Sequence, residues 1–159
     1  RLLIKGPRPE ELDFMHAPGR VEELAYYETI YREIELNPQL RGKVEFSGWG
    51  NNVADWYRDV DFILSPSEFE SFHYALADGI LSGCTPLIWP WDGAEGIYHP
   101  DWLISDEQEA VSLIMKTREL TVDDRIEDSK LKRTLLVERY GTVRIFDEID
   151  RVLYGDLVT

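Results

Sequence analysis

Apolar runs of strand length alternate along the chain with stretches of helical periodicity. Five such runs predict β-strands: RLLIKG (1–6), KVEFSGW (43–49), DFILSPS (61–67), TPLIWP (85–90) and DWLIS (101–105). FILS and PLIW lack the polar alternation of a half-exposed strand, which indicates strands that are buried on both faces.

The segments between and after these runs have helical spacing. Residues 20–35 carry an apolar stripe at intervals of three and four, and further helices are predicted at 52–60, 72–82, 107–120, 130–140 and 142–154. Gly83 ends the helix at 72–82, and Asp106 caps the one that follows it.

Strands that alternate with helices are typical of a parallel sheet with right-handed crossovers and helices on both faces. At 159 residues and 43% hydrophobic content, the chain has the length and the apolar material of one domain. We therefore predict a single domain over 1–159, a doubly wound, Rossmann-like α/β sheet with C-terminal helices. Such sheets bind ligands at the carboxyl ends of their strands.

The acidic composition restricts the partners. A net charge of −14 argues against a nucleic-acid or anionic-membrane surface, because both require clustered Lys and Arg. A phosphate ligand remains compatible, since helix N-terminal amides bind one without side-chain charge. The lone Cys84 forms no internal disulfide, and no apolar run is long enough for a transmembrane segment, so we expect a soluble, cytoplasmic protein. The chain opens on an apolar run without an initiator Met, which we interpret as a fragment of a longer protein.

The stretch SPSEFESFHYALADGILSG (65–83) carries the candidate chemistry. A helix that begins at Phe72 leaves the amides of Phe72, His73 and Tyr74 without intrahelical acceptors, at the end that favours an anion. Glu70 precedes these amides at the carboxyl edge of the strand, and Asp78 follows about two turns into the helix. Either the two carboxylates flank a diphosphate and ribose site, or they are a helix-start acid and a solvated surface acid.

Read together, this region resembles the retaining glycosyltransferases of the GT-B fold, in the large family called group one. Their hallmark is a strand that ends in Pro-Ser, an acid, seven residues, a second acid, a Gly, and a strand that contains Pro. The matching positions here are Pro66, Ser67, Glu70, Asp78, Gly83 and Pro86. VEFSGW, RLLIKGP and the loop DGAEGIY, with Gly93 and Glu95, resemble flanking segments of the same family.

The resemblance implies that the chain is the donor-binding, C-terminal half of a glycosyltransferase, an enzyme type used in polysaccharide biosynthesis. Glu70 would then contact the transferred sugar, and the segment of Ser71, Phe72, His73 and Tyr74 would hold the distal phosphate. Asp78 would hold the ribose. Gly48 and Trp49 are expected to lie near the base, and Glu95 is expected to approach the donor from the loop DGAEGIY.

The expected ligand is a UDP- or GDP-linked sugar as substrate, without a metal or a separate cofactor. The expected partner is an N-terminal acceptor domain of the full-length chain, without which the fragment transfers nothing. The pattern departs from the family at three places: Ser71 and His73 replace glycines, and Asp78 replaces the usual Glu. The Arg and Lys that neutralise the leaving diphosphate in the family are absent from this stretch of chain.

Two alternatives stay open. A nucleotide-sugar isomerase shares the GT-B architecture and would place its acids and His over two domains. A non-catalytic α/β module such as a receiver domain needs an Asp after its third strand and a Lys after its fifth, and FILSPS and PLIWPW supply neither.

Overall fold

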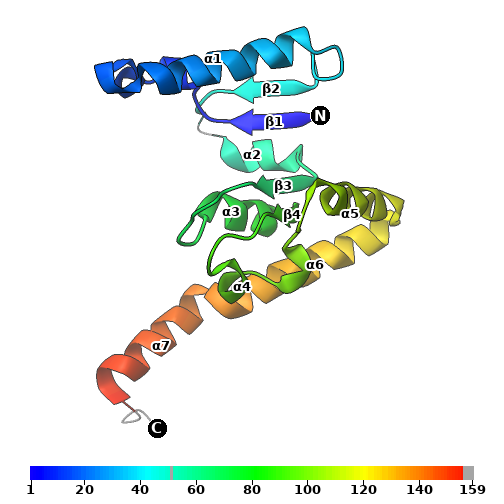
Figure 1. Cartoon of the computed structure of the whole chain (residues 1–159). Helices are drawn as coiled ribbons and strands as arrows, with labels where there is room; N and C mark the ends of the chain where they lie inside the picture. The colour runs from blue at the N-terminus through cyan, green and yellow to red at the C-terminus, as the bar shows by residue number, and fades with distance from the viewer. Residues whose placement is uncertain (51, 156–159) are drawn as a thin grey trace. The chain divides into compact units, whose positions relative to one another are not determined.

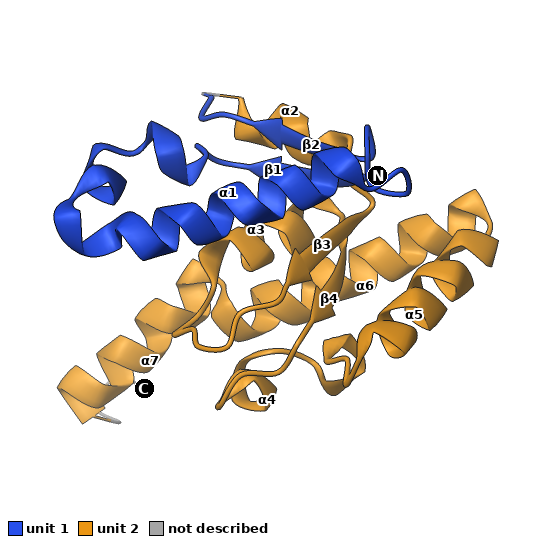
Figure 2. Cartoon of the chain, turned by 45° about the horizontal axis from the view of Figure 1, so that its top comes forward, with its two compact units in different colours: residues 1–51 blue, residues 52–159 orange. Residues whose placement is uncertain are grey.

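The computed structural model describes residues 1–50 and 52–155 and is a mixed α/β structure (Figure 1). The chain divides into two compact units, residues 1–51 and residues 52–159 (Figure 2). Each unit contains its own pair of parallel strands. The α/β class and the parallel pairing agree with the sequence analysis, whereas a single domain over 1–159 stays a prediction.

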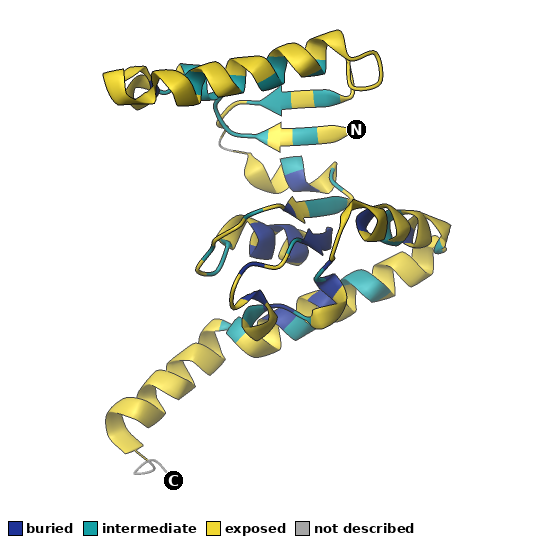
Figure 3. Cartoon of the chain, viewed as in Figure 1, coloured by how far each residue is buried: buried dark blue, intermediate teal, exposed yellow. Residues whose placement is uncertain are grey.

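The first unit pairs β1 (Leu2–Lys5) with β2 (Val44–Ser47) through the crossover helix α1 (Val21–Leu36). Three 3-10 turns, η1 (Pro9–Glu11), η2 (Asp13–His16) and η3 (Pro18–Arg20), lead from β1 to α1. Packing is thin in this unit. Met15 is its one buried side chain among the described residues, and the helix is exposed along most of its length (Figure 3).

The second unit pairs β3 (Phe62–Ser65) with β4 (Thr85–Ile88), and Ser65 lies opposite Ile88, so the carboxyl ends of the two strands coincide. The helices of this unit are α2 (Val53–Arg58), α3 (Tyr74–Ser82), α4 (Ala94–Ile97), η4 (Pro100–Trp102), α5 (Glu107–Glu119), α6 (Val122–Tyr140) and α7 (Thr142–Tyr154).

Both faces of β4 are covered. The prediction of a strand buried on both faces is wrong for FILS, because Leu64 of β3 is 37% exposed and only Ser65 is buried. Successive residues of a strand point to opposite faces, and Ile88 and Leu87 accordingly belong to different cores. Ile88 packs in a cluster formed mainly by α3, α4 and α6, which contains Leu76, Ala77, Ile80, Trp91, Ala94, Tyr98, Trp102 and Leu136. Leu87 packs with Ile104 and with Ala110 of α5. The lack of polar alternation in PLIW is thereby explained, since all four residues of β4 are buried.

The predicted fifth strand is wrong. Residues 100–102 form a 3-10 turn that starts at Pro100, which has no N–H to donate to a strand. Only a single parallel bridge remains, in which the Ile104 N–H donates to the Ile88 carbonyl at 2.8 Å.

Two helix starts also differ from the prediction. The helix expected at 130–140 begins at Val122, because the Thr121 hydroxyl caps it by accepting a hydrogen bond from the Asp124 N–H. The helix expected at 72–82 begins at Tyr74. The caps at Gly83, in left-handed conformation, and at Asp106 are confirmed.

Across residues 1–50 and 52–155, each helix is either too short or too polar to span a lipid bilayer.

Candidate functional site

The candidate site lies where β3 ends and the chain turns into α3. Ser65 is the last residue of the strand and is fully buried, and residues 66–73 connect it to the helix. Glu70 is half-buried in this connection and accepts a hydrogen bond from the Ser67 hydroxyl at 3.0 Å. The strand end thus presents one carboxylate that is held in place rather than free in solvent.

His73 controls how the helix begins. Its φ of 58° and ψ of 70° are left-handed, and it is the one non-glycine residue with positive φ among the described residues. This conformation costs a residue with a Cβ about 1 kcal/mol or more, so something must hold it. A hydrogen bond of 2.7 Å between His73 Nδ1 and Ser65 Oγ does so.

The left-handed turn leaves the helix start open. The N–H groups of Leu76 and Ala77 both donate to the His73 carbonyl, at 3.0 and 3.3 Å. The N–H groups of residues 72–75 donate to no acceptor among the described residues. The sequence analysis placed the free amides at 72–74 on a helix that began at 72. That start is wrong, but the amides themselves are free.

Tyr98, between α4 and η4, holds this loop through its backbone carbonyls. Its buried hydroxyl donates to the carbonyl of Phe72 at 2.6 Å and lies 3.3 Å from the carbonyl of His73. Burial raises the pKa of Tyr98 far above the usual value, with smaller contributions from Tyr140 and from Glu70, so the hydroxyl stays protonated and donating.

Trp91 adds an unpartnered donor at the same edge. It follows β4, is 3% exposed, and its ring lies about equally far from the rings of His73 and Tyr98, with centroids 6.0 Å apart in both cases. Its indole N–H is buried and has no hydrogen-bond partner among the described residues. A buried N–H without a partner is costly, but this N–H is inaccessible to solvent, so a ligand at the open helix start reaches it only if the side chains around it move.

Asp78 lies on the exposed side of α3, one turn beyond Tyr74. The helix buries Leu76, Ala77 and Ile80 on its other side. The Tyr57 hydroxyl donates to the carbonyl of Ala75 at 2.9 Å, and the pKa of Tyr57 is raised by burial first and by Asp78 second. Asp78 therefore lies near the contact between α2 and α3, open to solvent.

The remaining predicted site residues are dispersed. Ser71 and Tyr74 are exposed beside the free amides. Glu95 is an exposed first-turn acid of α4, after Gly93 in left-handed conformation, and makes no hydrogen bond or ion pair with a described residue. Gly48 and Trp49 belong to the first unit, where Trp49 is 79% exposed. No cluster of three His, Cys, Asp or Glu side chains suited to a metal occurs in residues 1–50 and 52–155.

Ser65, Trp91 and Tyr98 are the contributors that the sequence analysis missed. For Ser65 a signal existed, because a polar residue closed the apolar run FILS at the carboxyl end of a strand. Trp91 and Tyr98 lie 18 and 25 residues beyond His73 in sequence, and no spacing rule connects them to it.

The conformation at His73 gives a direct stability prediction. We expect His73→Gly to be more stable than His73→Ala by about 1 kcal/mol in urea unfolding, because both lose the Ser65 hydrogen bond but only Ala keeps the left-handed cost. The same pair at Ser112, an exposed position inside α5, should reverse the order by about 1 kcal/mol. Equal stability of the two His73 variants would mean that the residue is not left-handed in solution.

Comparison with known proteins gave no match to a family model, to a curated protein or to a solved structure.

Proposed function

We propose that this chain binds a nucleotide-sugar donor as the C-terminal half of a retaining GT-B glycosyltransferase, on a doubly wound parallel sheet. The observation that carries the proposal is the open helix start: consecutive free amides at residues 72–75, beside the half-buried Glu70, at the carboxyl end of β3. Free amides at a helix N-terminus bind phosphate without the help of lysine, which suits a chain of net charge −14.

The left-handed turn adds support from an independent direction. Glycine tolerates positive φ best, and the glycosyltransferase pattern that the sequence resembles has glycine where His73 stands. The residue differs, but the backbone has the conformation that glycine would serve. The resemblance also assigns Asp78 to the ribose. This role rests on the resemblance alone, because the structure places Asp78 on the solvent-exposed side of α3, near Tyr57 of α2, as a solvated surface acid.

The chemistry follows from these groups. In a retaining transfer, the bond from the sugar carbon to the nucleoside diphosphate breaks, the acceptor oxygen bonds to the same face of that carbon, and the acceptor's proton passes to the departing phosphate. Charge develops on the departing phosphate oxygen, and the amides at 72–75 stabilise it because they are already oriented and need no reorganisation. Glu70 would contact the sugar.

Nucleotide titration tests the proposal. Calorimetry with UDP, GDP and ADP is expected to show one preferred nucleotide, and Asp78→Ala is expected to weaken its binding about tenfold, because a charge-assisted bond to the ribose contributes on the order of 1.4 kcal/mol. Asp147→Ala removes an exposed carboxylate from α7 and serves as the matched control, with unchanged affinity. Absence of heat with all three nucleotides would contradict a donor site. An unchanged nucleotide affinity in Asp78→Ala would contradict only the ribose role of Asp78.

A further inference from the structure

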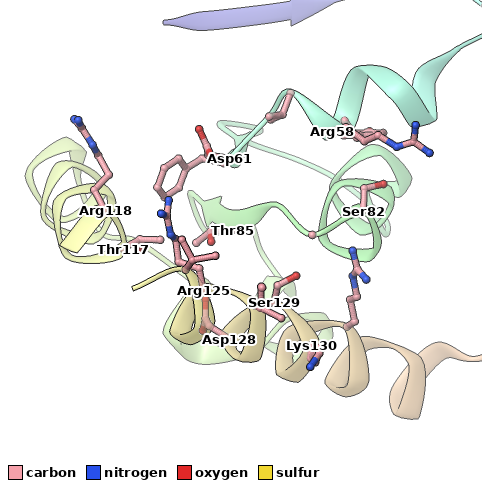
Figure 4. Close-up of a pocket in the computed structure, with 17 residues that line it drawn as sticks. Arg58, Asp61, Ser82, Thr85, Thr117, Arg118, Arg125, Asp128, Ser129 and Lys130 are labelled. Carbon is pink, nitrogen blue, oxygen red and sulfur yellow. The ribbon is translucent and has the colours of Figure 1, made fainter. Parts of the chain in front are cut away.

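The second unit contains a cavity at the other end of its strands. Its volume is about 600 Å³, and it is lined by Asp61 and Phe62 at the start of β3 and by Thr85 at the start of β4 (Figure 4). The C-terminal turn of α5 and the first three turns of α6 form the opposite side. The free amides at 72–75 lie past the carboxyl ends of the same strands, so the two sites are distinct.

The lining is strongly basic in a chain that is strongly acidic. The whole chain has 31 acidic and 17 basic side chains, yet this lining carries five cations against two carboxylates. The cations are Arg58, Arg118, Arg125, Lys130 and Arg133, and the carboxylates are Asp61 and Asp128. A cleft with such an excess of one charge concentrates small ions of the opposite sign.

Ion pairs account for only part of this set. Arg58 pairs with Asp55, and Lys130 pairs with Glu127 at 2.7 Å. Asp128 pairs with the buried Lys132, whose ammonium also donates to the Thr85 hydroxyl at 3.3 Å. In Figure 4, the side chains of Arg58, Arg118 and Lys130 lie at the margin and point away from the middle of the cavity.

Three guanidinium groups are left without a carboxylate. Arg118, Arg125 and Arg133 form no hydrogen bond or ion pair with any residue in the described part of the chain. The Arg125 side chain rises from α6 toward the strand ends (Figure 4). The Arg133 Nη2 atom lies 3.0 Å from the position that a Cβ at Gly83 would take, which places it at the end of α3.

Local helix energetics do not explain all three. Arg118 and Arg133 lie at the carboxyl ends of α5 and α3, where the helix dipole favours a cation. Arg125, by contrast, is in the first turns of α6, where the dipole disfavours one. Its guanidinium is solvent-exposed, as are those of Arg118 and Arg133, and is therefore open to an anion from solution.

We propose that this cavity binds a compact small molecule with two or more phosphate groups. Arg125 and Arg133 suit a ligand with more than one phosphate better than a single phosphate, because each planar guanidinium forms paired hydrogen bonds with phosphate oxygens. The Ser129 hydroxyl in the same lining adds a neutral donor. The volume lies within the range of small-molecule sites. This second site is independent of the donor site proposed above.

Calorimetric titration of the full chain with inorganic tripolyphosphate tests the proposal. We expect one binding event that weakens as sodium chloride is raised, and that weakens about tenfold in Arg125→Ala, which corresponds to the loss of one charge-assisted contact. Arg125→Lys keeps the charge but not the paired geometry and should lie between the two. Arg32→Ala, an exposed arginine of α1 with the same change of charge, should bind like the parent chain.

Further outcomes discriminate between the sites. Saturating tripolyphosphate should leave the affinity for the preferred nucleotide unchanged, whereas competition between the two ligands would place the anion at the donor site and overturn the proposal. No heat with tripolyphosphate, or an equal loss in Arg32→Ala and Arg125→Ala, would overturn it as well. Binding to anionic lipid vesicles without binding of free tripolyphosphate would also overturn the proposal. Thermal unfolding of each variant by circular dichroism confirms that the affinity changes are not losses of fold.

Discussion

Gly79→Ala is expected to lower the free energy of unfolding by about 2 kcal/mol, although the same change inside a helix ordinarily raises it. A Cβ at this position would lie 2.9 Å from the Cβ and Cγ1 atoms of Ile63 and 3.0 Å from its Cγ2. Ile63 is a β-branched residue in β3, so its side chain has little freedom to rotate away. Helix α3 would have to move off the strand that positions Glu70. Urea unfolding followed by circular dichroism measures the loss.

Gly96→Ala is the matched control. Gly96 is also helical, in α4, but a Cβ there meets nothing within 4 Å. Its substitution should be neutral or stabilising by up to about 1 kcal/mol. The double variant Gly79→Ala with Ile63→Ala should lose less stability than the sum of the two single variants. Ile63→Ala removes two of the three atoms that the new Cβ would approach. Equal effects at Gly79 and Gly96 would contradict the close packing of α3 on β3.

Local pattern was sufficient for β4 and for two helix caps of the second unit. The unbroken apolar run PLIW (86–89) predicted a strand buried on both faces, and β4 packs two separate cores through Leu87 and Ile88. Gly83 and Asp106 were identified as caps because cap preferences act within a single turn of chain. Such features depend on neighbours in sequence, which is why a sequence reveals them.

The start of α3 depends on residues that are distant in sequence. His73 is left-handed because Ser65 holds its ring and Tyr98 accommodates the turn through the Phe72 and His73 carbonyls. Helix periodicity alone extended the helix to Phe72, since Phe72 fits the apolar stripe and histidine carries no turn signal of its own. The sequence correctly predicts free amides at 72–74, but it places the first residue of the helix at Phe72 instead of Tyr74.

The sequence analysis did not predict the basic cavity. Its unpaired arginines come from α5 and α6 and are separated by seven and eight residues, so no run of positive charge marks them. The net charge of −14 excludes an extended basic surface but says nothing about a local cluster. Folding alone brings these side chains together near the starts of β3 and β4.

Separate expression of the two units is expected to give the largest effect of all. Residues 52–159 should unfold cooperatively, whereas residues 1–51 should have the far-UV circular dichroism of a largely unfolded chain. The first unit buries one side chain, Met15, among its described residues, which is too little to offset the conformational entropy of about fifty residues. The second unit holds both hydrophobic cores.

Nucleotide binding extends this test from folding to function. Glu70, the free amides at 72–75 and Asp78 all belong to residues 52–159, so this fragment should bind the preferred nucleotide if the proposed donor site is correct. The loss of affinity that the resemblance predicts for the fragment would come from the absence of Gly48 and Trp49. Trp49→Ala in the whole chain should reproduce that loss if its exposed ring stacks on the base. A cooperative unfolding transition of residues 1–51 alone would refute the premise that its few buried contacts are insufficient.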